Sequence, residues 1–108
     1  GGSMDGVDLR KLSEESHVTE VWEIVGEWIF WIEGCGKPLK IKVEKGSHGR
    51  YQGIANYKIW GPRQADPYIS IRLCDSVQEA VEDSLRGFLM FWNPAQADKI
   101  KLVPYENY

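Results

Sequence analysis

A short stretch near the middle of the chain alternates strictly between apolar and charged side chains. Leu39, Ile41 and Val43 share one side of an extended backbone, and two lysines and a glutamate occupy the other. This period of two is typical of a strand with one buried face and one face in water. Turns rich in glycine bound the stretch at 34–38 and 46–49, so we expect antiparallel strands on either side of it.

Three further segments fit strands of the same sheet. Residues 51–60 and 68–74 alternate in a similar way, and glycine and proline separate them. Residues 27–33 are rich in β-branched and aromatic side chains and run into a turn, which favours a strand. The preceding residues 18–25 fit helical spacing as well as a strand with a bulge near Gly26, so a helix there remains an alternative.

One amphipathic helix follows the predicted strands. Ser76 and Glu79 form an S-x-x-E capping box at its start, and Pro94 disfavours helical geometry in the residue before it. The predicted core stripe of this helix consists of Val77, Val81, Leu85, Phe88 and Trp92. The expected fold class is therefore α+β, a four-stranded antiparallel β-meander with one C-terminal amphipathic helix packed on one face (β-β-β-β-α).

The length of 108 residues fits one domain. Residues 1–3 precede a methionine and are interpreted as a cloning remnant, and the polar residues 4–17 as a flexible N-terminal segment. We expect residues 18–94 to form the single α+β domain. Residues 95–108 form a C-terminal tail with room for a short edge strand.

Composition and motifs argue against several classes of protein. The longest unbroken apolar run has five residues, far below the ~20 that span a bilayer, and nothing resembles a signal peptide, so we expect no membrane contact and a cytoplasmic location. Two cysteines without C-x-x-C spacing and two histidines predict no metal site, no cofactor and no Cys35–Cys74 disulfide. Paired-carboxylate, nucleophile and dinucleotide motifs are missing from the sequence, which favours a non-enzymatic protein.

The leading functional hypothesis is a small accessory or regulatory protein that acts by protein–protein contact, with a partner or with a second copy. The run from Trp28 to Ile32 is apolar on both faces, yet the helix covers only one face of the sheet, so a tail or a partner must cover the other. A stripe of small residues on the helix would admit a partner backbone, or close packing on the chain's own sheet. The predicted partner-binding residues are Trp28, Trp31, Ala80, Ser84, Gly87, Leu89 and Met90.

The alternative function is nucleic-acid or anionic-ligand binding. Net charge is −3, but residues 37–72 hold eight basic and two acidic side chains, whereas residues 1–36 hold two basic and eight acidic ones. Cations interleaved with aromatic rings on the open sheet face suit phosphates and bases, and the 45–50 turn is expected beside the helix N-terminus. A solvated face and a simple hairpin turn are the competing interpretations. The predicted set is Lys40, Lys42, Lys45, His48, Arg50, Lys58, Trp60, Tyr68 and Arg72.

Overall fold

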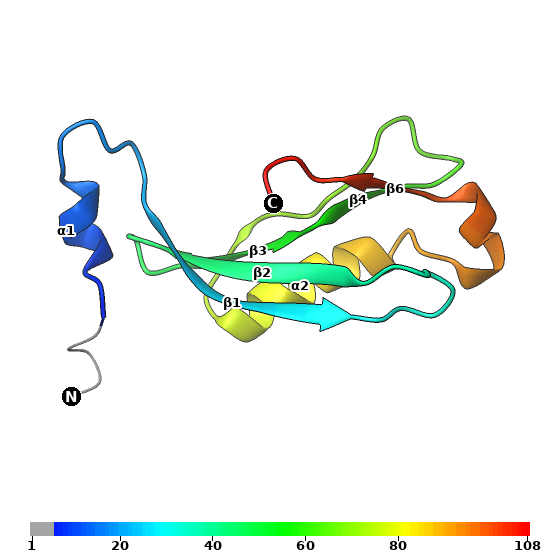
Figure 1. The fold of residues 1–108 in the computed structure, drawn as a ribbon, viewed down its shortest axis with the longest axis horizontal. Coiled ribbons are helices and arrows are strands. Elements are labelled where there is room, and N and C mark those ends of the chain that lie inside the picture. Colours follow the sequence, from blue (N-terminus) through cyan, green and yellow to red (C-terminus); the bar gives the residue numbers. More distant parts are fainter. Residues whose placement is uncertain (1–5) are drawn as a thin grey trace.

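Four strands pair into an antiparallel sheet in the order β1-β2-β3-β5, and one long helix packs on one of its faces (Figure 1). The computed structural model describes residues 6–108, so the predicted remnant at 1–3 lies outside the described residues. A second, two-stranded sheet joins β4 and β6. The predicted α+β class, with a four-stranded antiparallel sheet and one packed helix, is confirmed. The elements are α1 (Leu9–Ser13), β1 (Trp22–Phe30), β2 (Leu39–Gly46), β3 (Tyr51–Ala55), β4 (Tyr57–Trp60), β5 (Leu73–Cys74), α2 (Val77–Leu89), the 3₁₀ segment η2 (Pro94–Lys99) and β6 (Lys101–Pro104).

β1 begins earlier than the sequence predicted. It pairs with β2 from Trp22 onward, so the alternative of a helix over 18–25 is wrong. The register moves from Ile24 opposite Glu44 to Gly26 opposite Val43, which leaves one extra residue on β1 and confirms the bulge. Pairing with the full length of β2 decided the ambiguity, because the local spacing fitted either structure.

The predicted strand 51–60 divides at Asn56. The side-chain oxygen of Asn56 accepts a hydrogen bond from the Lys40 amide at 2.9 Å, and the Asn56 amide donates to the Lys40 carbonyl at 2.9 Å. The chain then leaves the main sheet, and β4 pairs with β6 instead. The short strand expected in the C-terminal tail is therefore present, in a sheet of its own.

The predicted strand 68–74 is mostly wrong. Only Leu73 and Cys74 pair with β3, and Tyr68 makes an isolated bridge to Ile59. The residues between leave the sheet, and Ser70 donates a hydrogen bond to Asp83 of α2 at 2.8 Å. Contact with the helix therefore replaces the expected ladder.

α2 begins as the capping box predicts. Ser76 Oγ accepts from the Glu79 amide at 3.1 Å, and the Glu79 carboxylate accepts from the Asp75 amide at 3.2 Å. Within the helix, however, the buried face is centred on Ala80, Ser84, Gly87 and Phe88, and the predicted stripe residues Val77, Val81 and Leu85 are only half-buried.

Close approach of α2 to β3 explains this rotation. A Cβ atom added to Gly53 on β3 would lie 2.3 Å from the Ala80 carbonyl oxygen, so the strand has no side chain between its backbone and the helix. Small residues on both elements bring the backbones together and turn the larger helical side chains to the flank. Leu39, Ile41 and Val43 of β2 are buried, as their alternation predicted.

The two ends of the chain differ in their contacts. At the N-terminal end, Leu9–Ser13 form the short helix α1, capped by an oxygen of Asp8 that accepts from the Lys11 amide at 3.2 Å. At the other end the tail returns to the sheet, where the Tyr105 amide donates to the Asn56 carbonyl at 2.9 Å and Tyr108 contacts Lys42. Over residues 6–108 there is no helix whose length and apolar character would let it cross a membrane.

Candidate functional site

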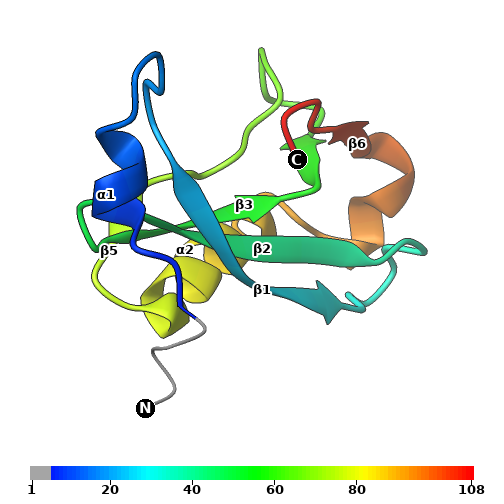
Figure 2. The ribbon, with the colours of Figure 1, turned by 60° about the vertical axis from the view of Figure 1, so that its left-hand side comes forward.

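β1 and the residue after it carry the largest group of exposed apolar side chains among residues 6–108. β1 is an outermost strand of the main sheet, and among the described residues no strand pairs with its outer edge (Figures 1 and 2). Ile24 is 64% exposed, Ile29 is 56% exposed, and Trp31, directly after the strand, is 75% exposed. Val25 and Trp28 are also exposed. No other stretch of similar length in residues 6–108 leaves so many large apolar side chains in water.

The position of α2 leaves this strand uncovered. The helix packs chiefly against β3 and also against β2 and β5, so it lies closer to the β5 edge of the sheet than to the β1 edge. On the open face, Glu27 and Ile29 of β1 lie opposite Lys42 and Lys40. Trp28 points to the helix side, opposite Ile41. Both faces of β1 thus carry apolar side chains beyond the reach of the helix.

Part of the open face is covered from within the chain. The Lys42 ammonium contacts the carbonyl oxygen of Tyr108 and lies 4.7 Å from the centre of its ring, and the Tyr108 hydroxyl bonds to Glu27. The C-terminal tail therefore covers part of the open sheet face, where the sequence predicted cover by either a tail or a partner. It does not bury Ile24, Ile29 or Trp31.

The small-residue stripe of α2 is not available to a partner. Ala80, Ser84 and Gly87 are buried against the chain's own sheet and the 69–72 segment, and a Cβ atom on Gly87 would lie 2.7 Å from that of Ser70. Their prediction as partner-binding residues is wrong. The alternative, close packing of the helix on its own sheet, describes them correctly.

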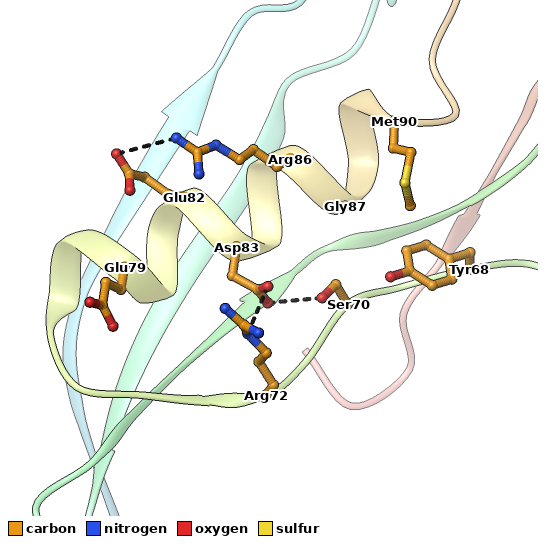
Figure 3. Close-up of a pocket in the computed structure, with 9 residues that line it drawn as sticks. All are labelled: Tyr68, Ser70, Arg72, Glu79, Glu82, Asp83, Arg86, Gly87 and Met90. Atoms are coloured by element: carbon orange, nitrogen blue, oxygen red, sulfur yellow. Dashed lines mark hydrogen bonds and ion pairs between the residues drawn. The ribbon is translucent and has the colours of Figure 1, made fainter.

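The remaining predicted anchors do not form one surface. Trp28 and Trp31 belong to the β1 edge, whereas Met90 lies beside Tyr68 on the β5 side of α2 (Figure 3). Met90 is thus exposed apart from the β1 surface that Trp28 and Trp31 share with Ile24, Val25 and Ile29, and Leu89 is exposed at the end of α2. Sequence reasoning did not single out Ile24 and Val25 because a helix over 18–25 stayed open, although the β-branched side chains around Gly26 were a signal for a strand. Ile29 lay within the predicted strand 27–33 and its apolar run but was not named as an anchor.

A hollow of about 290 Å³ lies between α2 and the 68–72 segment (Figure 3). Asp83 accepts from Ser70 Oγ and pairs with Arg72 Nε at 3.0 Å, and Glu82 lies 3.9 Å from Arg86. The carboxylates are thus engaged by neighbouring groups of the same chain. This cluster acts as a clasp that holds the 68–72 segment on the helix.

The 45–50 turn lies beside the N-terminus of α2, as the meander predicts, but its cations do not converge. Arg50 pairs with Asp75 at 3.3 Å, the ring centres of His48 and Trp22 lie 5.4 Å apart with the rings nearly perpendicular, and the Lys45 ammonium lies 5.9 Å from the Tyr51 ring centre. The hydrogen bond from the Gly49 amide to the Gly46 carbonyl at 3.0 Å closes an ordinary hairpin turn.

The predicted basic face is also dispersed. Lys40 and Lys42 lie on the open face of the main sheet. Arg72 faces α2, and Tyr68 packs against Phe91 with ring centres 5.1 Å apart. The prediction of one continuous cationic and aromatic surface is wrong, because the 68–74 segment is not a strand. Lys40 and Lys42 stay together on β2, and Lys58 and Trp60 stay together on β4.

Metal ligation and disulfide chemistry find no support in the part of the chain that is described. Residues 6–108 contain no group of three or more His, Cys, Asp and Glu side chains placed to hold a metal ion. Cys35 and Cys74 are both free thiols, with Cys35 in the β1–β2 turn and Cys74 at the far end of the sheet. Comparisons with known protein families, curated proteins and solved structures found no match for the chain.

Proposed function

We propose that the chain is a small, non-enzymatic binding domain that joins a partner protein by adding one of the partner's strands to β1. One observation carries this proposal: a nine-residue edge strand with exposed large apolar side chains on both faces. Long apolar edges invite pairing with another chain, and folded proteins normally shorten, charge or cover them. Strand addition is a common mode of recognition, in which backbone hydrogen bonds give affinity and side-chain contacts give specificity.

The magnitudes favour several anchors acting together. Full burial of one large apolar side chain contributes roughly 1.5–3 kcal/mol, and the fraction still exposed in Ile24, Trp28, Ile29 and Trp31 is available to a partner. Association itself costs about 4–15 kcal/mol in lost motion. Two anchors would not offset that cost, whereas four anchors approach the lower part of its range, and the hydrogen bonds of a backbone ladder would add to their contribution.

Charge supports a basic partner segment. Residues 12–36, which include β1, hold six glutamates and neither lysine nor arginine. Pairing with a second copy of β1 would place two acidic strands side by side, and like charges across a strand pair are destabilising. The complementary occupant is an extended segment of another protein in which lysine or arginine alternates with large apolar residues.

Synthetic peptides of the same length as β1 test this proposal. One alternates valine with lysine, a second alternates valine with glutamate, and a third repeats the first with N-methyl groups on alternate residues, which removes its pairing donors. We expect the first peptide to shift the amide signals of Gly26–Phe30 in an NMR titration and the other two to leave them unchanged. Equal shifts with all three, or none with the first, would overturn the proposal.

A matched pair of variants locates the contact. Trp31→Ala is expected to weaken binding of the lysine peptide by about tenfold or more, because exposed tryptophans at strand edges are typical anchors. Met90→Ala removes a side chain of comparable exposure, 64% against 75%, beside the hollow between α2 and the 68–72 segment, and should not change affinity. Equal losses in the two variants would place binding elsewhere.

A further inference from the structure

The small sheet β4–β6 presents a second surface, independent of β1. Ile59 is fully buried and Leu102 packs against the core. Because side chains alternate along a strand, Lys58, Trp60 and Lys101 point to the opposite, outer side. The register places Trp60 directly opposite Lys101, so an indole ring and an ammonium group are neighbours on that side.

A hollow of about 270 Å³ lies at one end of this outer surface. It lies between the turn that follows β4 and the junction of η2 with β6. Its lining residues are Trp60, Gly61, Pro62, Gln64, Lys99 and Lys101. Two lysines and an indole thus surround it, and no carboxylate belongs to the lining.

The indole is held in place by the turn beneath it. Trp60 Nε1 donates to the Gln64 carbonyl at 2.9 Å. The Gln64 side chain accepts from the Gly61 amide at 2.6 Å and donates to the Ile59 carbonyl at 3.3 Å. A ligand that stacks on Trp60 would therefore meet a ring that is already positioned, and little ordering cost would oppose binding.

The lysines of the hollow are free of ion pairs, as are the other lysines among the described residues, whereas three arginines are paired. Arg50, Arg72 and Arg86 each pair with a carboxylate. The ion pairs found within residues 6–108 involve neither Lys99 nor Lys101. The hollow is distinguished by the two lysines that line it together with an indole ring that the turn holds in place.

We infer that this hollow binds a nucleobase next to a phosphate, with the base stacked on Trp60 and the phosphate held by Lys99 and Lys101. Every base has a flat face that stacks on an indole, and lysines neutralise the adjoining phosphate. A single strand of nucleic acid and a free nucleotide share this chemistry. Of the residues that the sequence predicted for anion or nucleic-acid binding, only Trp60 lines this hollow. Lys58 lies beside it on the same strand.

The test follows the indole N–H signal of Trp60 in NMR titrations of the whole chain with a short oligothymidylate, adenosine monophosphate and inorganic phosphate. Tighter binding of the oligonucleotide would support the site with a single strand as its ligand, and equal or tighter binding of the mononucleotide would support it with a free nucleotide as its ligand. An equal response to inorganic phosphate, or no response to any probe, would overturn the inference.

Charge variants provide the control. Replacement of both lysines (Lys99→Gln with Lys101→Gln) should weaken oligonucleotide binding about tenfold or more. It should also make the slope of log affinity against log salt shallower by roughly 0.7, the contribution of one neutralised phosphate of a single strand. The matched double variant Lys37→Gln with Lys40→Gln removes the same charge elsewhere and should bind as the parent does. Identical behaviour of the two variants would overturn the inference, and unchanged melting temperatures would show that both are folded.

Discussion

The two edge strands of the main sheet, β1 and β5, differ in length and in how many apolar side chains they expose. The β5 edge has only two paired residues, and the segment before it is clasped to α2 by Asp83 with Ser70 and Arg72. The β1 edge has nine residues, and exposed isoleucine, valine and tryptophan side chains project from it. Both edges belong to one sheet, so the contrast comes from their side chains and from the position of the helix.

The contrast shows where this fold excludes a further strand and where it admits one. A very short edge, followed at once by a helix, offers no length for pairing. A long apolar edge offers both backbone groups and burial, and the bulge near Gly26 confines a regular ladder to the C-terminal half of β1. Binding by strand addition is therefore expected on one side of the molecule only.

Gly53→Ala is expected to have the largest effect on stability. Its Cβ atom would lie 2.3 Å from the Ala80 carbonyl oxygen, a backbone atom that cannot turn away. We expect a loss of about 1–3 kcal/mol in the free energy of unfolding, the usual cost of overpacking, measured by urea denaturation. If the variant were as stable as the parent, α2 would not lie so close to β3, and the reason for the uncovered β1 would fail.

The clasp at the β5 edge should contribute less. Asp83 is 18% exposed and holds both Ser70 and Arg72, so Asp83→Ala should cost about 1–2 kcal/mol, as hydrogen bonds to a charged group do. Arg72 is 72% exposed, and Arg72→Ala should cost under about 1 kcal/mol because water screens the pair. Denaturation midpoints of the two variants give the comparison, and a larger loss for Arg72→Ala would contradict it.

Ser84→Ala is expected to stabilise the protein. The Ser84 hydroxyl is buried at 2% exposure and has no hydrogen-bond partner among the described residues. Removing a buried, unsatisfied hydroxyl recovers part of a desolvation penalty of about 1–3 kcal/mol, so we expect a gain of up to about 1 kcal/mol in thermal or urea denaturation. Ser13→Ala, on exposed α1, serves as a surface control, and a loss of stability in Ser84→Ala would show that its hydroxyl has a partner.

Ile29→Thr should have the smallest effect on stability and a distinct effect on binding. The side chain is 56% exposed at the open edge, and threonine keeps the β-branch, so the free energy of unfolding should change by less than about 0.5 kcal/mol. Affinity for the lysine peptide should nevertheless fall, because an anchor is lost. A variant that unfolds more easily and binds normally would mean that β1 is part of the core rather than a docking edge.

Local chemistry predicted much of the fold from particular residues. The alternation of Leu39, Ile41 and Val43 identified the buried face of β2, and Ser76 with Glu79 identified the start of α2. The 68–74 segment was mispredicted because its alternation is equally compatible with packing on a helix. Among the candidate sites, Trp28 and Trp31 were found from their run of apolar neighbours, and Lys99 and Lys101 were missed because they meet Trp60 only when β6 pairs with β4.

The sequence alone determined the elements whose signals are local: a period of two, a capping box, and glycines at turns. It also determined the acidic character of β1 and its apolar side chains. Tertiary structure decided how those elements meet, because contacts between residues far apart in the chain have no local signature. Close approach of Ala80 to Gly53 placed α2 away from β1, and the departure of β4 from the main sheet at Asn56 created the surface around Trp60.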